Sequence, residues 1–388
     1  ASTLAVIHLG LGQSGEMLDW LEKAFEERCP LLVILPHWYE WDQYRDNPRF
    51  QRIYHAMGFE EHAAPRRSTE RAGKTLRVSG GVRRTQVEAK SSPGSKAQVG
   101  SAAGLACLSH KQDRIPIAVL PFDDFSPNSE DSYFADGIHE EITSRLASIS
   151  ALAVKGRTSV GRYRQAPPPI PTIGQELGVS FLLEGSARIA GDRVRLTAQL
   201  IDAALDEHNW TETYDRRFSI ENLFEVQEDI AQQVALAIGT EISSEDEVRM
   251  ASRPTANLQA YVSYMKGMES WKQFTDEGTQ QAIDQLNHAI ALDPTFAEAY
   301  AGLATAYSQL GLGFGRGDEA PHDVMPLAKE AVQRAIQLKP SSPDGYANLG
   351  FIVLTYDFDY PEAERLLTRA VELDPERAIS YGLLAHVY

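Results

Sequence analysis

Cysteine is scarce in this chain, and long apolar runs are absent from it. It has two cysteines, Cys29 and Cys107, which lie far apart and form no CxxC pair, so a disulfide framework and a cysteine zinc site are both excluded. It has no run of 18 or more apolar residues, and we therefore expect no transmembrane span. The apolar stretch at residues 4–11 has no basic residues before it, so we do not expect a signal peptide.

Positive charge is also scarce, except in one segment. The formal net charge is -17 at pH 7, and such a chain repels nucleic acid and anionic membranes. Residues 62–114 differ, with eleven Lys or Arg residues against three acidic ones and many Gly, Ser and Ala residues. Because this segment offers few large apolar groups to bury, we interpret it as a disordered linker. A basic tether for nucleic acid or a membrane surface is the alternative.

No arrangement typical of a catalytic or metal site is present. The glycines at 311, 313, 315 and 317 resemble a phosphate loop, but they follow a predicted helix and lack the GK[ST] signature, so we expect a loop between helices. His139, Glu140 and Glu141 could ligate a metal, but neighbouring side chains diverge on a helix, and a solvated helix face is favoured. Asp123 and Asp124 end a predicted strand without a paired base, so a turn is favoured over a catalytic role. We expect no cofactor and no catalysis.

Residues 115–240 read as a small α/β domain. The apolar run at 115–122 predicts a strand, and apolar residues at helical spacing from 133 predict a helix with Asp131 or Ser132 as its N-cap and Arg145 on its wet face. Further strands are expected at 152–158, at 179–189 paired with 193–201 around Gly191, and at 208–214. A long amphipathic helix follows, and the acidic segment 243–254 then predicts a hinge. The fold class is thus α/β plus all-α.

From about residue 257 to 388 the chain repeats itself. Three segments end alike, with AIALDP at Pro294, AIQLKP at Pro340 and AVELDP at Pro375, at intervals of 46 and 35 residues. After each proline an aromatic residue returns, then a leucine and a small residue, while paired alanines recur seven residues apart before it. The expected packing residues are Tyr300, Leu303, Ala304, Ala328, Ala335, Pro340, Tyr346, Leu349, Gly350, Ala363, Ala370 and Pro375.

This pattern predicts stacked helix hairpins. Small residues allow two helix backbones to approach closely, the aromatic and leucine side chains fill the adjacent space, and proline ends the second helix. The pattern resembles the tetratricopeptide repeat, and it implies a solenoid with a concave surface for a peptide or a partner helix. Gln309 and Asn348, expected to be exposed on first helices, are candidate groove contacts.

The first 61 residues fit the end of a similar array. Trp20, Leu21 and Phe25 provide apolar bulk at helical spacing, and the motif Asn47-Pro48-Arg49-Phe50 resembles the segment that precedes the last short helix of repeat arrays in bacterial signalling proteins. We interpret residues 1–61 as a detached repeat hairpin and closing tail. Because the chain opens with this tail and stops inside a repeat, we expect a fragment of a tandem protein or a read-through of two genes.

The α/β region resembles a family as well. The segments VLPFDDFSPNSEDSYFADGIHEEI, LLEGSARIAGDRVRLTAQLID and LFEVQEDIA are similar to the TolB amino-terminal-like (FlgO-like) domain. This resemblance implies a bacterial protein in which the domain lies between an output domain and tetratricopeptide repeats. The output domain in such proteins is often a class III adenylate cyclase or a CadC-type winged-helix regulator and sometimes a Ser/Thr kinase, and no catalytic residues carry over.

Two functions follow as expectations. The first is a non-catalytic scaffolding module that binds a protein or peptide partner in the repeat groove. The alternative is the non-catalytic regulatory part of a cyclase or transcription regulator whose output domain lies outside this chain. The resemblance allows either side of the inner membrane, with the cytoplasm favoured over the periplasm.

Overall fold

The computed structural model describes residues 14–29, 32, 41, 44–57, 114–128, 131–164, 166–312, 320–374 and 378–387. The expected linker at 62–114 lies outside these ranges except for Arg114, as do Pro375 and residues 313–319 of the glycine-rich stretch. All elements below belong to one of the two units of the chain, Ala1–Glu61 with Arg114–Tyr388. None of the described helices is both long enough and apolar enough to cross a membrane.

A mixed sheet forms the first folded region, as the sequence predicts. Its main strands lie in the order β3-β1-β4-β5-β6, and β2 pairs with β4. Their bounds are β1 (Ile115–Val119), β2 (Asp123–Asp124), β3 (Leu152–Val154), β4 (Phe181–Ala190), β5 (Arg193–Asp202) and β6 (Glu207–Arg217). β1 runs parallel to β3 and β4, whereas β4, β5 and β6 form an antiparallel ladder.

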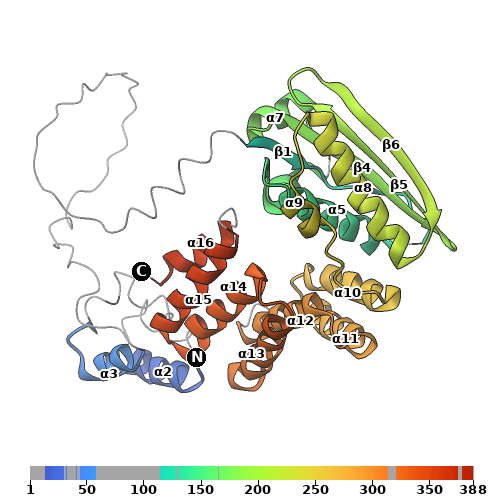
Figure 1. Ribbon diagram of the computed structural model, residues 1–388. Coiled ribbons are helices and arrows are strands. Elements are labelled where there is room, and N and C mark those ends of the chain that lie inside the picture. Colours follow the sequence, from blue (N-terminus) through green and yellow to red (C-terminus); the bar gives the residue numbers. More distant parts are fainter. Residues whose placement is uncertain are drawn as a thin grey trace, which may run out of the picture. The chain divides into compact units, whose positions relative to one another are not determined.

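Helices α5 (Tyr133–Ala147) and α8 (Ile220–Ile238) provide the apolar side chains that cover one face of this sheet (Figure 1). Along β5, Val194, Leu196, Ala198 and Leu200 are buried on that face, which confirms the predicted alternation. Among the described residues, the opposite face is covered near β1 and the start of β4 by the short helices α6 (Arg157–Val160), η4 (Gly161–Arg164) and α7 (Ile170–Leu177).

Three local predictions in this region are wrong. The strand expected at 152–158 ends at Val154, because β3 is an edge strand that pairs only with β1, and the last bond of that ladder is Lys155 N–H to Ile117 O. Ser132 precedes α5 in a helical backbone conformation and makes no side-chain capping bond. Arg145 is buried, with 5% of its surface exposed, instead of lying on a wet face.

The acidic segment at 243–254 contains a helix, where a hinge was predicted. Ser243 and Asp246 form a capping box at the start of α9 (Ser244–Met250). Asp246 is fully buried and accepts hydrogen bonds from the Ser150 backbone N–H and hydroxyl, both at 3.1 Å. The Arg145 guanidinium donates to the Met250 carbonyl. This short helix is therefore attached to the end of α5 by hydrogen bonds that no hydrophobic periodicity predicts.

The second folded region consists of helix hairpins, as expected from the repeats. The pairs are α10 (Leu258–Trp271) with α11 (Asp276–Leu292), α12 (Ala297–Gly311) with α13 (Pro321–Leu338), and α14 (Pro343–Ile352) with α15 (Tyr360–Leu373). A π-helical turn, η5 (Val353–Asp357), extends α14, and α16 (Ala378–Ala385) follows α15.

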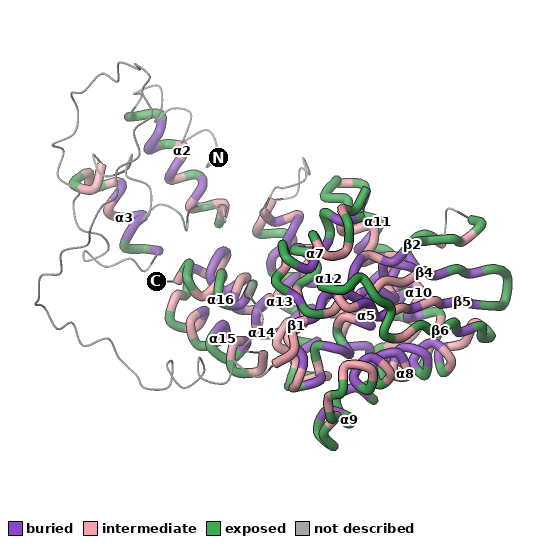
Figure 2. The backbone as a smooth tube through the Cα atoms, turned by 90° about the horizontal axis from the view of Figure 1, so that it is seen from above, coloured by how far each residue is buried: buried purple, intermediate pink, exposed green. Residues whose placement is uncertain are grey.

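Two further helices come from the N-terminal piece, α2 (Ser14–Glu26) and α3 (Pro48–Ala56). Asn47 caps α3 by accepting from the Arg49 N–H at 2.9 Å, and Pro48 occupies its first turn, so this motif begins the short helix. The buried side of α2 is visible in Figure 2 and includes Met17 and Leu21. Its core also includes Phe358 from the end of η5, whose ring lies 6.2 Å from that of Phe25.

Candidate functional site

Successive hairpins meet in a regular way. Each second helix contacts the following first helix, as α11 does with α12 and α13 with α14. The first helices α10, α12, α14 and α16 also contact one another in series. In solenoids of this kind the closely spaced helices line the inner, concave side, which is the usual binding surface. The side on which first helices face one another is therefore the candidate site, and we call it the inner face.

The structure places most of the predicted packing residues inside the hairpins. Those that are buried are Leu303, Ala304, Ala328, Ala335, Gly350, Ala363 and Ala370. Tyr300, Tyr346 and Leu349 are half-buried, and Pro340 is exposed in the turn between α13 and α14. Their shared role in packing stays a prediction until it is tested by substitution.

Glycines mark where two helices come closest. A Cβ atom added to Gly350 on α14 would lie 2.7 Å from Leu367 Cγ on α15. In the first hairpin, a Cβ added to Gly267 would lie 2.9 Å from Leu286 Cγ. Both distances are shorter than real Cβ contacts, so these positions need a residue without a side chain. The sequence pattern identified Gly350 but missed Gly267, which lies before the first repeated segment.

The two candidate groove residues turn out to bridge helices. Gln309, expected to be exposed, is only 5% exposed, and its Nε2 donates to the Thr279 hydroxyl of α11 at 3.2 Å. Asn348 is half-buried and its Nδ2 donates to the Thr305 hydroxyl of α12 at 3.0 Å. Because the second bond joins two first helices, it lies on the inner face. The exposure predicted for Gln309 is wrong, because helical spacing does not show which face a neighbouring helix covers.

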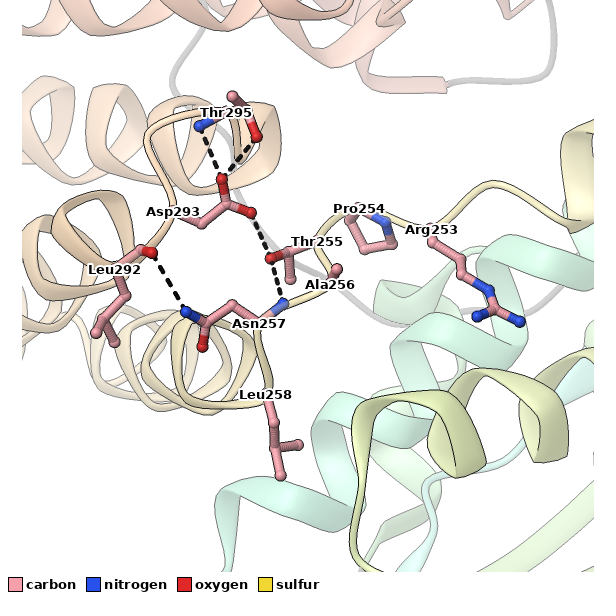
Figure 3. A pocket seen from close by; sticks show the side chains of 9 residues that line it. All are labelled: Arg253, Pro254, Thr255, Ala256, Asn257, Leu258, Leu292, Asp293 and Thr295. Atoms are coloured by element: carbon pink, nitrogen blue, oxygen red, sulfur yellow. Dashed lines mark hydrogen bonds between the residues drawn. The ribbon is translucent and has the colours of Figure 1, made fainter.

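A pocket lies where the first hairpin begins (Figure 3). Asn257 caps α10 and its Nδ2 also donates to the Leu292 carbonyl at 3.2 Å. The Thr255 hydroxyl donates to Asp293 Oδ2 at 2.5 Å, and Thr295 donates its N–H to Asp293 Oδ1 at 2.9 Å (Figure 3). These groups bind one another, so the pocket holds the start of the array together and leaves few free polar atoms for a ligand.

Asp293 has a lowered pKa because of these contacts. Burial by itself would raise the pKa of this carboxyl, but the hydrogen bonds from Thr255 and Thr295 outweigh it. The carboxylate is thus fixed in its charged form as a structural acceptor. A group that is so fully bonded is a poor general base, because it must lose stabilising hydrogen bonds to take up a proton.

The first hairpin is built into the core of the sheet region. Tyr261 of α10 is fully buried, and its ring lies 5.2 Å from that of Phe224 on α8. Met265 packs so closely on α5 that a Cβ added to Gly137 would lie 2.5 Å from its sulfur. The guanidinium of Arg145 lies 5.6 Å from the Phe224 ring. The sheet region and the first hairpin therefore share one continuous hydrophobic core.

Charged side chains also gather where α5 meets the hairpins. Burial raises the pKa of Glu141 to about 7, with Glu298 and Glu140 adding to the effect and Arg145 opposing it. Burial likewise raises the pKa of Glu269, although Lys272 opposes the shift. Lys272 also approaches Glu140 at 3.0 Å, so one lysine joins α5 to α10.

Asp136 behaves differently from these glutamates. Burial would raise its pKa, but the guanidinium of Arg164 outweighs that effect and holds the pKa of Asp136 below its usual range. The charge of Asp136 also adds to the rise in the pKa of Glu269. The pair thus keeps Asp136 charged and favours protonated Glu269.

The sequence placed His139, Glu140 and Glu141 on a solvated helix face, which is wrong for His139, while Glu140 and Glu141 are half-buried. His139 is 3% exposed, and its Nε2 lies 3.1 Å from the Val119 carbonyl oxygen. Burial lowers the pKa of this imidazole, which favours its neutral form. The described residues include no cluster of three or more His, Cys, Asp or Glu side chains arranged to hold a metal. His139 thus has a structural role beneath β1.

The acidic pair at the end of the first strand forms a short strand of its own. Asp123 and Asp124 make up β2, paired with Ser186 and Ala187 of β4, and both are exposed. Asp124 accepts from the Ser126 N–H at 2.9 Å, which is a turn contact as predicted. The two carboxylates therefore lie in a strand and a turn, and neither is paired with a catalytic base.

Comparison with known proteins gives one relative and several partial likenesses. No family model matches the chain. A protein of Rhizobium meliloti (strain 1021) named "Putative adenylate cyclase 3" is 34% identical over 248 residues, which are 64% of this chain and 41% of that protein. The chain therefore spans less than half the length of this relative.

Each of several solved structures resembles about a third of the chain. One is the first TPR of Spaghetti (RPAP3) bound to an HSP90 peptide, with 22% identity and a TM-score of 0.28 over 33% of this chain and 90% of that one. Another is the Arabidopsis OM64 TPR domain, with 18% identity and a TM-score of 0.28 over 33% of this chain and 93% of that one. A third is lipoprotein GNA1162 from Neisseria meningitidis, with 17% identity and a TM-score of 0.25 over 31% of this chain and 96% of that one. Scores this low carry no argument about the partners of this chain.

Proposed function

We propose that this chain is a non-catalytic protein–protein interaction module of a bacterial signalling protein, and that it binds a peptide or helix of its partner on the inner face of the hairpins. The observation that carries the proposal is the series of first helices that contact one another, bridged by Asn348 and Thr305. Such repeat arrays bind extended or helical segments along their concave side. The relative named as an adenylate cyclase supports the signalling context.

Display selection followed by substitution tests this function. A peptide library is panned against the full chain, and enriched peptides are measured by fluorescence anisotropy. Because Asn348 lies on the inner face, Asn348→Arg should weaken binding of these peptides at least about tenfold by placing a charged side chain between α12 and α14.

The matched control is Gln333→Arg on α13, an exposed position on a second helix, which adds the same charge away from the inner face. It should leave the affinity unchanged. If both variants bind equally well, or if no peptide is enriched over many rounds, the inner face is not the binding site.

A second candidate function rests on the longer relative. We propose that this chain is the non-catalytic regulatory part of a class III adenylate cyclase or of a winged-helix regulator, with the output domain outside this chain. In this proposal residues 115–240 are a TolB amino-terminal-like domain, 257–388 are repeats, 62–114 is a linker and 1–61 is the closing tail of an array. The identity of 34% to a protein of that name supports a bacterial cyclase context.

Activity assays test the two claims of this proposal, that the chain is not catalytic and that it regulates a catalytic domain. The full chain, incubated with ATP and Mg²⁺ or Mn²⁺, should form no cyclic AMP above the rate of a heat-denatured sample. Fusing the chain to a separate cyclase catalytic domain should change the activity of that domain if the chain is regulatory. Turnover by the chain alone would contradict the non-catalytic assignment.

A further inference from the structure

The far side of the sheet has a polar surface that the hairpins do not use. On β4, β5 and β6, the residues opposite the hydrophobic core include Ser186, Thr197 and Thr213, which are register partners across the three strands. Thr197 and Thr213 join their hydroxyls at 3.2 Å. The turn between β4 and β5 is exposed (Figure 2). We call this surface the open sheet face.

Two arginines lie directly opposite each other on the open sheet face. Arg188 of β4 is the register partner of Arg195 of β5, and both are exposed. Like charges in such a cross-strand pair repel, because their Cβ atoms are only about 5 Å apart. The neighbouring carboxylate of Asp215 is bound instead by Arg193, whose Nε donates to it at 2.8 Å. Within the described residues, neither Arg188 nor Arg195 has an ion-pair partner.

An exposed aromatic ring continues the same row. Phe125 follows β2 directly, and its N–H donates to the Ala187 carbonyl at 2.9 Å, which sets it beside Arg188. By strand alternation it faces the same way as Asp123, whose register partner Ser186 belongs to the open sheet face. Its side chain is 63% exposed. Arginine and aromatic residues together are the side chains most enriched at protein interfaces.

We propose that this row, formed by Phe125, Arg188 and Arg195, is a docking site for an acidic segment of a protein partner that also carries an apolar side chain. The two arginines offer guanidinium groups that a carboxylate can bridge, which would remove their mutual repulsion. The partner's apolar side chain would cover Phe125. This site is on a different part of the molecule from the inner face and does not depend on the function proposed for the hairpins.

The shape and charge of the chain favour a peptide over other anions. The open sheet face suits a macromolecular segment, because small-molecule sites are concave. The formal net charge of -17 disfavours a nucleic acid, which depends on many basic contacts along its backbone. An acidic peptide needs only the local pair of arginines.

Anisotropy with a defined probe tests this site on the full chain. The probe is a fluorescein-labelled peptide of glutamates with two leucines, and it should bind the wild-type chain. Arg188→Gln combined with Arg195→Gln should weaken this binding at least about tenfold, and Phe125→Ser about threefold or more. The charge-reversed chain, Arg188→Glu with Arg195→Glu, should lose the acidic probe and gain binding of the same peptide with lysines in place of the glutamates.

Matched controls make the result decisive. Arg334→Gln with Arg369→Gln removes the same charge from exposed positions on α13 and α15 and should leave the affinity unchanged. The double glutamine variant at 188 and 195 should melt at the same temperature as wild type or up to a few degrees higher, because it removes a repulsion. Equal affinity in that variant overturns the proposal, as does tighter binding of a twenty-residue thymidine oligonucleotide than of the acidic peptide.

Discussion

The sheet region and the hairpins bury their side chains over very different sequence distances. Within a hairpin the packing partners are close in sequence, as Gly350 is to Leu367 of the next helix. In the sheet region, β1 pairs with strands that begin at Leu152 and Phe181, and Arg145 donates to the carbonyl of Met250. Local partners leave a repeating mark in the sequence, whereas distant partners do not.

Yet the two regions are not independent. Tyr261 belongs to the first hairpin and is fully buried against Phe224 of the sheet region. The first hairpin is thus held both by its own repeat contacts and by the sheet core. The later hairpins, α12 to α15, rely mainly on their neighbours. This difference predicts that a substitution in the shared core destabilises both regions, whereas a substitution in a later hairpin destabilises only that hairpin.

The largest effect is expected at the shared core. Phe224→Ala should lower the free energy of unfolding by about 3–5 kcal/mol, because it leaves a cavity between α8 and α10. Urea unfolding gives the magnitude, and hydrogen exchange shows where protection is lost. Both β5 and α10 should exchange faster. Faster exchange in β5 with α10 unaffected would show that the two regions unfold separately.

A smaller and more local effect is expected in the third hairpin. Gly350→Leu should cost about 1–3 kcal/mol by forcing α14 away from α15, since even a Cβ would lie 2.7 Å from Leu367 Cγ. Gly382→Leu on α16 is the control, because a Cβ there meets nothing within 4 Å. Hydrogen exchange should localise the loss to α14 and α15. Equal melting temperatures for the two variants would contradict the close packing.

A smaller loss of stability, which depends on pH, is expected when the attachment of α9 is removed. Asp246→Ala should cost about 1–2 kcal/mol, because it removes the capping box and the bonds to Ser150. Burial would raise the pKa of Asp246, but these hydrogen bonds outweigh it and lower the pKa. The stability that it contributes is therefore present above its ordinary pKa of 3.8 and lost as pH falls below that value.

Thermal melts of wild type and Asp246→Ala at several pH values measure this effect. The difference between the two chains should be constant near neutral pH and shrink at acidic pH. A difference that grows on acidification would mean that the carboxylate is not the stabilising form.

The smallest effect concerns Glu141, where α5 meets the hairpins. Burial raises its pKa from 4.5 to about 7, so the folded state favours the protonated form. The stability linked to this group is complete below pH 4.5 and is lost as pH rises through 7. Glu141→Gln should therefore stabilise the chain at pH 8 by on the order of 1 kcal/mol and change little at pH 4.5.

Melting temperatures of both chains from pH 4.5 to pH 8 test this prediction. Glu140→Gln is the matched control, because Glu140 pairs with Lys272 at 3.0 Å and Arg157 at 2.6 Å and should lose stability instead. A pH-independent difference for Glu141→Gln would show that its carboxyl is solvated.

Much of the fold could be predicted, whereas the details of the candidate site could not. The alternating residues of β5 and the seven-residue alanine pairs identified the strand and hairpin faces, because side-chain direction follows from local backbone geometry. Gln309 fits the same helical pattern but is buried by Thr279 of the preceding helix. The buried state of His139 and Arg145 likewise depends on β1 and α9, which the spacing of residues along α5 does not encode.

The sequence by itself determined where the main strands and the repeat helices form and which small residues allow them to pack, because these follow from short-range periodicity and the steric needs of the backbone. Only the tertiary structure decided which polar groups are buried and which remain exposed. It turned the acidic segment after α8 into a capped helix and joined the first hairpin to the sheet core. It also set Arg188 opposite Arg195, because burial and cross-strand partners depend on residues brought together from distant parts of the chain.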